Sequence, residues 1–402
     1  MTASADTEPA LRAQDLRLVP VAVAVWGAAL ASVLLPAAAV PIAGTGWGLV
    51  ALGLLVWRRL PVRHRTACGL VVLSCVAVGA VAAHVAAAMP ARSAVVEFAV
   101  GGGRSIELEV VATSKVERHG AALWFDAEAH RLTRGGQQRS GALPVTVSVP
   151  ADAVAGARLD LGATVRVAGA AQAGEAGDRA ALVVFARGAE VTDGPWGPLD
   201  AAATLRDGFV DRASALPAPG SLLLPGLAVG DTRAVTDELD EQMKATSLSH
   251  LTAVSGANCA LVVGIAFGAA ALCGARRGVR IGLAAAALIG FVVLVTPEPS
   301  VVRAGTMACI ALFALGLGRL GPGVSLLSLA AVGLLLTDPW LATSYGFALS
   351  VVATGSLLLV AGPIARGLSR WLPLPLAAAL SVPFAAQLAC GPVLVLLAPE
   401  VP

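Results

Sequence analysis

Charged residues are scarce in this sequence. Asp, Glu, Lys and Arg make up 13% of its 402 residues, whereas 57% are hydrophobic and the mean hydropathy is +0.79. This charge content excludes an ordinary soluble globular protein, in which about 25% of residues are charged. Aromatic residues are scarce as well, at 4%, so the apolar character comes from small aliphatic side chains, which suit close packing of helices in lipid. The composition predicts a polytopic membrane protein.

Lysine and extramembrane cysteine are also nearly absent. Lys115 and Lys244 are the only lysines and the net charge is +2, so no basic tail indicates a nucleic-acid partner. The six cysteines all lie outside the polar stretch 92–244. That stretch must therefore fold without a disulfide, and the spacing of the cysteines is not one that metal binding requires.

Charge-free segments predict where the chain crosses the membrane, because a transmembrane helix needs about 20 mostly apolar residues. Three such spans precede the polar stretch and six follow it. They lie in 18–57 (two spans, divided by Pro and Gly residues), 66–91, 245–275, 281–297, 301–318, 320–337, 339–365 and 371–399. We therefore expect a polytopic α-helical membrane protein with about nine transmembrane helices.

Arginines in the short connections predict the orientation of these spans. They follow the second, fourth, sixth and eighth spans, at 58–65, 276–280, 319 and 366–370. Positively charged loops remain in the cytoplasm, and an even number of spans separates each of these loops from the next. One topology satisfies them all: the N-terminus is cytoplasmic, and the polar stretch between the third and fourth spans is external.

The external stretch alternates apolar and polar residues as β-strands do. Five such segments, separated by Gly and Pro turn signals, lie at 106–115, 122–133, 145–149, 164–168 and 182–190. Five short strands in about 100 residues favour a small inserted all-β domain, an OB-like barrel. Barrels of this kind often bind single-stranded nucleic acid through basic and aromatic side chains.

A predicted hairpin in this domain is the best local candidate for contact with DNA. It carries Arg131, Arg134 and Arg139 near Trp124 and Phe125. The domain as a whole has eleven Lys and Arg against twelve Asp and Glu between 92 and 193, so it offers no broad electrostatic attraction to DNA. A solvated loop beside two core aromatic residues is the alternative interpretation of the hairpin.

Two amphipathic segments follow the β domain and predict a helical connector. In 199–216, Leu205 lies on an apolar face opposite Arg206, so we expect a helix that lies along the membrane surface. In 235–243, Thr236 is the expected N-cap of a second helix. The expected domains are therefore 1–91 (three spans), 92–195 (OB-like domain), 196–245 (connector) and 246–402 (the later spans).

The first span after the connector opens with an unusual density of polar residues. Within ten positions it carries Ser249, His250, Thr252, Ser255, Gly256 and Asn258. Polar groups at membrane depth are tolerated only where they line protein or water, so this segment indicates a pore-lining or gating role. A helix-packing motif is the alternative.

Several segments of this region resemble those of a known family. SHLTAVSGANCALVVG (249–264) resembles the signature of the ComEC competence-protein family, the membrane channel for single-stranded DNA in natural transformation. Further segments resemble family motifs in the same order: LLLPGLAVGDTRAV (222–235), PEPSVVRAGTMA (297–308), DPWLATSYGFALSVVATGSLLL (338–359) and AAQLACGPVL (385–394). With the external β domain, the resemblance extends over nearly the whole chain.

The resemblance implies a channel component in the bacterial cytoplasmic membrane that needs no cofactor. The implied partners are single-stranded DNA, the lipid bilayer, a DNA receptor, a cytoplasmic DNA-translocating ATPase and further copies of the chain as a homo-oligomer. The polar pattern and the family motifs together place a set of residues along the pore or its gate. They are His250, Ser255, Gly256, Asn258, Glu298, Ser300, Arg303, Tyr345, Ser350 and Gln387.

Arg303 is the principal cation of this set. An arginine at membrane depth needs a partner, and both the carboxylate of Glu298 and a DNA phosphate suit it. Two other residues have simpler alternative roles. Tyr345 lies at the end of a predicted span, where it can act as an interfacial anchor, and Gln387 can form an inter-helix hydrogen bond.

The sequence also departs from the family. Ala257 and Asn258 stand where many members have a Leu-His pair, so a role that needs an imidazole there is not carried over. Many members continue with further helices and a metallo-β-lactamase-like domain, whereas this sequence stops at Pro402, and its five scattered histidines cannot hold two metal ions. We therefore expect no catalytic residue, no metal site and no enzyme activity. The nuclease activity then lies on another polypeptide, or the chain is an inactive truncated copy.

The energy for transport must come from another protein, because the sequence has no phosphate-binding GxxxxGK[ST] loop. The alternative function is transport of a small anionic or lipidic substrate by the same fold.

Overall fold

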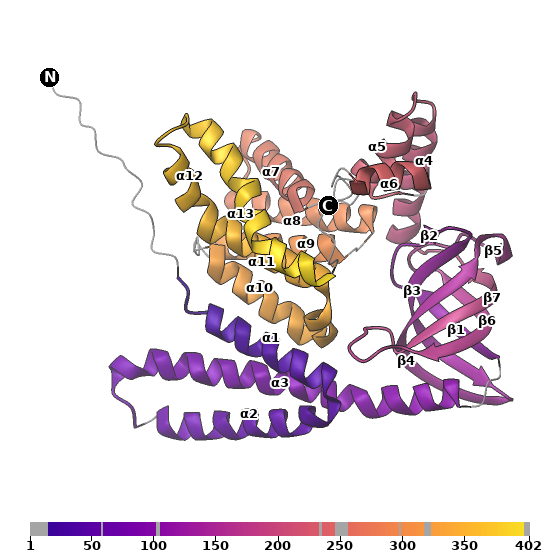
Figure 1. Ribbon diagram of the computed structural model, residues 1–402, viewed down its shortest axis with the longest axis horizontal. Coiled ribbons are helices and arrows are strands. Elements are labelled where there is room, and N and C mark those ends of the chain that lie inside the picture. Colours follow the sequence, from indigo (N-terminus) through magenta and orange to yellow (C-terminus); the bar gives the residue numbers. More distant parts are fainter. Residues whose placement is uncertain are drawn as a thin grey trace.

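The computed structural model describes residues 15–57, 59–101, 105–232, 235–245, 256–296, 299–316 and 323–397. It is mostly helical, with one β domain that lies to the side of two groups of helices (Figure 1). The first group precedes the β domain in the sequence and the second group follows it.

The first group is a tight antiparallel arrangement of apolar helices. Its members are α1 (Val19–Leu34), α2 (Pro36–Trp57) and α3 (Val62–Val100). Helices α2 and α3 approach closely because small residues face each other: a Cβ atom built at Gly46 would lie 2.9 Å from the Cα atom of Gly79. Such backbone contact is how small residues stabilise helix pairs in lipid.

Helix α3 continues past residue 91, where the predicted third span ends, and reaches the β domain (Figure 1). Its last turns continue as helix because they are apolar on the side that meets the barrel. Ala99 is buried in the core of the β domain, and Val95, Val96 and Phe98 pack against that core. The first group of helices is thereby packed directly against the β domain.

Five strands of the β domain form a closed ring of pairings. The strands are β1 (Ile106–Ala112), β2 (Glu117–His119), β3 (Ala122–Arg134), β4 (Gln137–Pro150), β5 (Val154–Gly156), β6 (Thr164–Ala173) and β7 (Leu182–Asp193), with a 3₁₀ turn, η1 (Ala151–Ala153), before β5. β1 pairs with β3 and β6, β3 with β4, β4 with β7, and β7 with β6. The β4–β7 pair is parallel and the other four are antiparallel, while β2 and β5 attach to β3 and β7.

The five predicted strands are confirmed as β1, β3, β4, β6 and β7. β4 begins at Gln137 rather than at 145, because its first residues pair with the end of β3 although both of their faces are exposed. Inside the ring, every second residue of β1 is buried, from Ile106 to Ala112. These side chains meet valines of β4, β6 and β7 in one core, as the predicted alternation requires.

The connector and the second group of helices follow β7. Their elements are α4 (Pro198–Ser214), α5 (Gly220–Val229), α6 (Asp237–Ala245), α7 (Gly256–Leu272), α8 (Arg277–Val295), α9 (Pro299–Gly316), α10 (Gly323–Thr337), the 3₁₀ helix η3 (Pro339–Thr343), α11 (Tyr345–Ser356), the π-helical turn η4 (Leu357–Ala361), α12 (Gly362–Leu368) and α13 (Leu374–Leu397). The predicted N-cap of α6 is confirmed, since Thr236 Oγ1 accepts a hydrogen bond from the Leu239 N–H at 3.3 Å.

Helix α4 differs from its prediction on one face. Leu205 is 65% exposed, as a membrane-surface helix would have it, but Arg206 is only 6% exposed. The expectation that Arg206 lies on the solvent-facing side is therefore wrong. The guanidinium is buried because partners from the β domain and from α8 surround it.

The chain is a membrane protein by the length and apolar character of its helices. Within the described residues, five helices are long and apolar enough to cross a bilayer: Pro36–Trp57, Val62–Val100, Arg277–Val295, Tyr345–Leu368 and Leu374–Val395. Several other apolar helices are shorter, among them α1, α7, α10 and Val301–Gly316 of α9. Large side chains such as Leu55, Leu261 and Leu388 are exposed on these helices, as surfaces that face lipid require.

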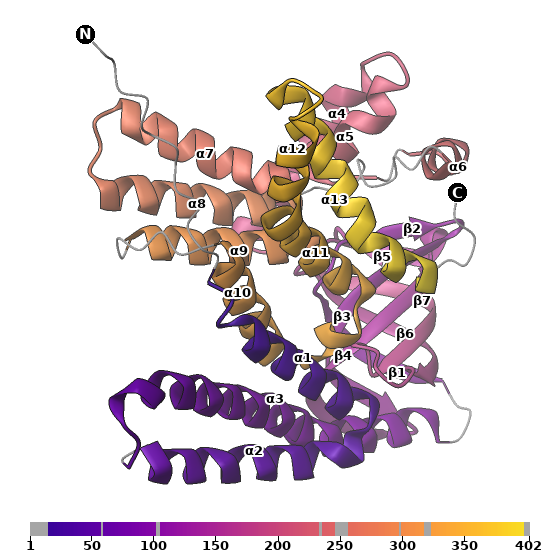
Figure 2. The same ribbon diagram turned by 60° about the vertical axis from the view of Figure 1, so that its left-hand side comes forward.

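The two groups of helices pack against each other along α1. Both views show α1 between α3 and α10 (Figures 1 and 2). Val25 and Phe347 are fully buried in this contact, and Trp26 packs on Phe347 with ring centroids 4.8 Å apart while its indole N–H donates to the Ala342 carbonyl at 3.0 Å. The N-terminal helix therefore supports the segment where η3 leads into α11.

Candidate functional site

Arg303 lies in the second turn of α9 and is almost completely buried. Its side chain is 7% exposed. Its Nε and Nη1 atoms are buried without a hydrogen-bond partner among the residues that the structure describes. Burying a charged donor without a partner is costly, so this guanidinium is the most conspicuous unsatisfied polar group of the helical bundle.

The N-terminus of α11 lies beside this guanidinium. Ser344 caps the helix, because its Oγ accepts a hydrogen bond from the backbone N–H of Phe347 at 3.3 Å. Next to the cap, a Cβ atom built at Gly346 would lie 3.9 Å from Arg303 Nη1 and 3.9 Å from Ser344 Oγ. The glycine therefore keeps the space between the helix end and the guanidinium free of side-chain atoms.

Ser350, one turn further along α11, faces the same interior. It lines a cavity of about 10 Å³ together with Arg303, and Phe347 and apolar residues of α10 complete the walls. This volume holds about one water molecule. In the folded chain, Arg303 is thus enclosed on its α10 side.

The segment before α11 is anchored at both of its ends. The Asp338 carboxylate accepts the N–H of Trp340 at 3.2 Å and so caps η3. At the other end, Thr343 Oγ1 donates to the Gly177 carbonyl in the loop between β6 and β7 at 2.7 Å. The β domain therefore contributes directly to the position of the α11 N-terminus.

The other predicted pore residues are divided between this site and the periphery. Gly256 begins α7 against α9, since a Cβ atom built there would lie 3.3 Å from the Cβ atom of Ala304. Asn258 is half-buried on the same helix. Tyr345 begins α11 and is 52% exposed, whereas Gln387 is exposed on α13. Gly256 therefore lies against α9, the helix of Arg303, and Tyr345 lies at the α11 N-terminus beside Arg303, whereas Gln387 lies exposed on α13.

Some predicted residues are not tested by the structure. His250, Ser255 and Glu298 lie outside the described residues, and Ser300 is described only as part of α9. The predicted pairing of Glu298 with Arg303 therefore stays a prediction.

The arginines of the predicted external DNA-binding hairpin have partners within the chain. Arg134 donates to a backbone carbonyl in the last turns of α3, and Arg139 donates to the Ala94 carbonyl of that helix at 3.1 Å. Arg131 forms an ion pair with Glu109 on β1. Cations suit the C-terminal end of a helix, where the last carbonyls lack intrahelical partners, and the carbonyl that Arg134 contacts, that of Phe98, is one of these. These contacts attach the hairpin to α3, a role that the sequence analysis did not foresee.

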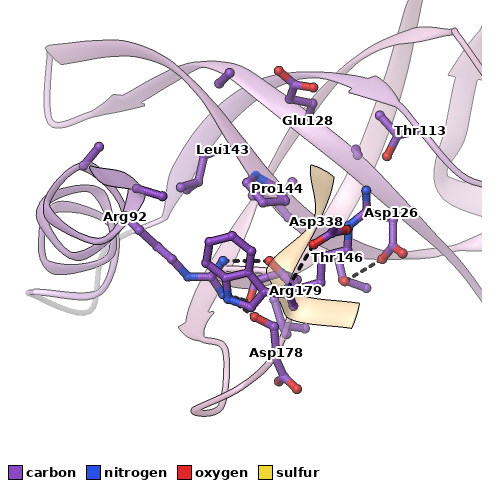
Figure 3. Close-up of a pocket in the computed structure, with 18 of the residues that line it drawn as sticks. Arg92, Thr113, Asp126, Glu128, Leu143, Pro144, Thr146, Asp178, Arg179 and Asp338 are labelled. Atoms are coloured by element: carbon purple, nitrogen blue, oxygen red, sulfur yellow. Dashed lines mark hydrogen bonds and ion pairs between the residues drawn. The ribbon is translucent and has the colours of Figure 1, made fainter. Parts of the chain in front are cut away.

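A second feature that sequence reasoning missed is a cavity of about 720 Å³ between the β domain and the helices (Figure 3). Its walls come from α3, from β3 and β4, from the β6–β7 loop and from the segment around Asp338. Arg92 and Asp178 lie at one side of the cavity, and Asp126, hydrogen-bonded to Thr146 at 2.7 Å, lies at the other (Figure 3).

The β6–β7 loop is held in this cavity by one residue of α3. The Arg92 guanidinium donates to the carbonyls of Asp178, Arg179 and Ala180 at 2.5, 2.8 and 2.9 Å. It also stacks 5.1 Å from the centroid of the Trp340 ring. The sequence signal was a single arginine directly after a predicted span, which does not reveal partners that lie more than 80 residues away.

The charges that line this cavity are mixed. Arg179 pairs with Asp338 at 2.9 Å, and Arg92 is occupied by the loop. Asp126, Glu128 and Asp178 are the remaining carboxylates of the lining. The cavity therefore does not attract a polyanion, and of the two features only the Arg303 site has an unused cationic group.

Arg206 shows how the chain satisfies a buried arginine elsewhere. It donates to Asp160 at 2.7 Å and to the Leu294 carbonyl at 2.8 Å, at the end of α8. The Asp160 carboxylate belongs to the loop before β6, so one guanidinium joins the β domain, α4 and α8. Arg206 and Arg303 are buried to nearly the same degree, but only Arg206 has hydrogen-bond acceptors among the described residues.

Comparison with known proteins finds a family model that matches the later part of the chain. Residues 227–402 match the family model described as Competence protein. The matched segment extends from α5 to the end of the chain and contains α9, α11 and the Arg303 site. No curated protein and no solved structure matches the chain.

Proposed function

We propose that this chain, whose residues 227–402 match the family model described as Competence protein, is a membrane channel component for uptake of single-stranded DNA across the cytoplasmic membrane in natural transformation. The family match carries the proposal, since it spans every helix of the second group. The physical requirement is a hydrated path with polar or cationic groups, because each nucleotide brings a charged phosphate.

The proposal includes the nine-span topology. Five described helices have membrane-crossing length, and α1, α7, α9 and α10 coincide with the four remaining predicted spans. In this topology the N-terminus is cytoplasmic and the β domain external. The arginine-rich connections then all face the cytoplasm, which favours this orientation over its inverse.

We assign the external domain to the OB-like class on its strand pairing. A closed ring of five strands with one parallel pair agrees with the five-stranded Greek-key barrel of that class. In the proposal the domain forms the outer vestibule and the second group of helices forms the path. α7, α9 and α11 supply the polar side chains of that path, and Arg303 is its cation.

In this proposal the chain conducts DNA and does not cut it. A cytoplasmic DNA-translocating ATPase provides the driving force, a DNA receptor delivers the strand, and the working channel contains more than one copy of the chain. Transport of a small anionic or lipidic substrate is the competing function, since an unpaired arginine also suits such a molecule.

The test is DNA uptake in the bacterium that carries the gene. A deletion strain should lose entry of labelled DNA into a nuclease-resistant pool, and the intact gene should restore it. Arg303→Gln and Asn258→Leu should restore it poorly, whereas the matched surface variant Arg370→Gln should restore it fully, because Arg370 is exposed. Normal uptake in the deletion strain would refute the proposal.

A further inference from the structure

We infer that Arg303 and the N-terminus of α11 together form a binding site for one phosphate group. The inference deepens the proposed function and rests on it, because the phosphodiesters of DNA are the ligand that the proposed function supplies. The site itself is defined by the structure alone. It consists of a helix N-terminus and a neighbouring buried guanidinium, two of whose nitrogen atoms have no partner among the described residues.

The guanidinium provides the first set of donors. Arg303 is 7% exposed, and two of its nitrogen atoms are buried with no acceptor among the described residues. Arg206, equally buried, has a carboxylate and a backbone carbonyl as acceptors. The fold thus satisfies a buried arginine where it has only a structural role. At Arg303 no described residue accepts a hydrogen bond from Nε or Nη1, and in this inference a ligand provides the acceptors.

The helix N-terminus provides the second set of donors. The first intrahelical bond of α11 runs from Ala348 N to Ser344 O, and the Ser344 side chain takes the N–H of Phe347. The N–H groups of Tyr345 and Gly346 come before that bond and have no intrahelical acceptor. Together with the helix dipole they favour an anion at this end of α11, which is 12 residues long.

Gly346 has no side chain that would stand between the two sets of donors. The position of its missing Cβ atom lies 3.9 Å from Arg303 Nη1 and 3.9 Å from Ser344 Oγ, and the residue itself is exposed. A ligand atom at this position contacts the guanidinium and the helix end at once. Any side chain here would occupy that position.

The ligand class follows from the donors. A planar guanidinium beside free backbone N–H groups matches the several acceptor oxygens of a phosphate or phosphodiester. The group is recognised by its charge and oxygens and not by a base, so such a site would treat all DNA sequences alike. A lipid headgroup and free phosphate carry the same chemistry, and the experiment below separates these sources.

The experiment measures binding to the full chain in nanodiscs of phosphatidylcholine, which has no net charge. The probe is a fluorescein-labelled oligothymidylate of about 12 nucleotides, followed by anisotropy at low salt, where phosphate contacts are strongest. Arg303→Gln removes the guanidinium and Gly346→Val fills the space beside it. Arg370→Gln is the control, because it removes the same charge from an exposed position.

We expect wild type and Arg370→Gln to bind alike, and Arg303→Gln and Gly346→Val to bind about 10- to 100-fold more weakly, the loss typical of one or two charge-assisted hydrogen bonds. Arg303→Lys should have an intermediate affinity, since lysine keeps the charge but lacks the planar set of N–H donors of the guanidinium. An oligomer with uncharged methylphosphonate linkages should bind weakly to every variant. Equal binding of the phosphodiester probe by wild type, Arg303→Gln and Gly346→Val would overturn the inference.

Competition identifies the source of the phosphate. Displacement of the probe by unlabelled oligothymidylate, but not by millimolar inorganic phosphate or by phosphatidylglycerol in the nanodisc, assigns the site to DNA. Displacement by phosphate or by phosphatidylglycerol supports a phosphate site whose ligand is the free ion or the lipid. In those two cases the site stands and its link to DNA uptake fails.

Two further results separate this inference from the proposed function and from ion pairing within the chain. If oligonucleotide binding depends on Arg303 but deletion of the gene leaves DNA uptake normal, the site is upheld and the proposed function is rejected. If deletion abolishes DNA uptake but Arg303→Gln shows normal uptake and normal binding, the proposed function is upheld and the site is rejected. If Arg303→Gln and Glu298→Gln lower the thermal midpoint equally and without additivity, then Glu298 is the partner of Arg303 and the inference is wrong.

Discussion

Two arginines that are buried to the same degree should respond to the same substitution with opposite sign. Arg206 is 6% exposed and Arg303 is 7% exposed. Methionine has a similar length and no charge, so Arg206→Met and Arg303→Met each remove a guanidinium from the interior of the folded chain. We predict that Arg206→Met destabilises the protein and that Arg303→Met stabilises it when no ligand is bound.

The magnitudes follow from the partners. Arg206→Met leaves the Asp160 carboxylate and the Leu294 carbonyl without their donor, and removal of one member of a buried ion pair costs about 3–5 kcal/mol. Arg303→Met instead removes two buried nitrogen atoms that have no acceptor among the described residues. Each such atom costs about 1–3 kcal/mol, and replacement of buried charged groups by well-packed apolar ones is often stabilising by about 1–4 kcal/mol.

The assay is unfolding of the purified protein in one detergent, followed by the fluorescence of its seven tryptophans. Both variants and wild type are compared in phosphate-free buffer, and the thermal midpoints should fall in the order Arg303→Met, wild type, Arg206→Met from highest to lowest. Added phosphate or oligothymidylate should raise the midpoint of wild type but not that of Arg303→Met. A loss of stability in Arg303→Met comparable to that in Arg206→Met would refute the reasoning, because it would mean that Arg303 has a partner in the free protein.

Three other tests concern contacts that connect the helices and the β domain. Gly46→Ala should lower stability by about 1–3 kcal/mol because its Cβ atom would meet the backbone of α3, whereas Gly48→Ala, with open space around it, should have little effect in the same unfolding assay. Arg92→Ala removes three hydrogen bonds to the β6–β7 loop, so hydrogen exchange of residues 174–181 should become faster while exchange in the β1 strand is unchanged. The double variant Arg134→Ala and Arg139→Ala should loosen the end of α3, seen as faster proteolysis there, with oligonucleotide affinity reduced less than threefold; a large loss of affinity with unchanged proteolysis would restore the hairpin to the role of DNA contact.

The sequence was informative wherever structure depends on neighbouring residues. The alternation from Ile106 to Ala112 placed β1 correctly, because burial on one face of a strand repeats every second residue. Thr236 was recognised as an N-cap for a similar reason, since the hydrogen bond that defines it lies within one turn. Charge-free runs also located the apolar helices, although the length of α3 depended on packing against the barrel, which the runs do not encode.

The sequence was misleading where the partner of a side chain lies far away in the chain. Arg206 was expected to face solvent because polar residues adjoin it, but its acceptors come from residue 160 and from the end of α8. Arg134 and Arg139 were candidates for contact with DNA, and in the folded chain both donate to backbone carbonyls of α3, so their contact with DNA stays a prediction. In each case the acceptor of the hydrogen bond lies far away in the chain.

The sequence by itself therefore determined the membrane class of the protein, its β-strands and the match of residues 227–402 to one family model, since composition, periodicity and ordered motifs are local properties. Tertiary structure decided which of the polar residues have unused hydrogen-bonding capacity. Arg303 on α9 lies more than 40 residues before Gly346 and Ser350 on α11, and only the packing of these helices brings it to them. Whether a buried charge is structural or available to a ligand depends on the acceptors around it, and those acceptors are assembled only when the chain folds.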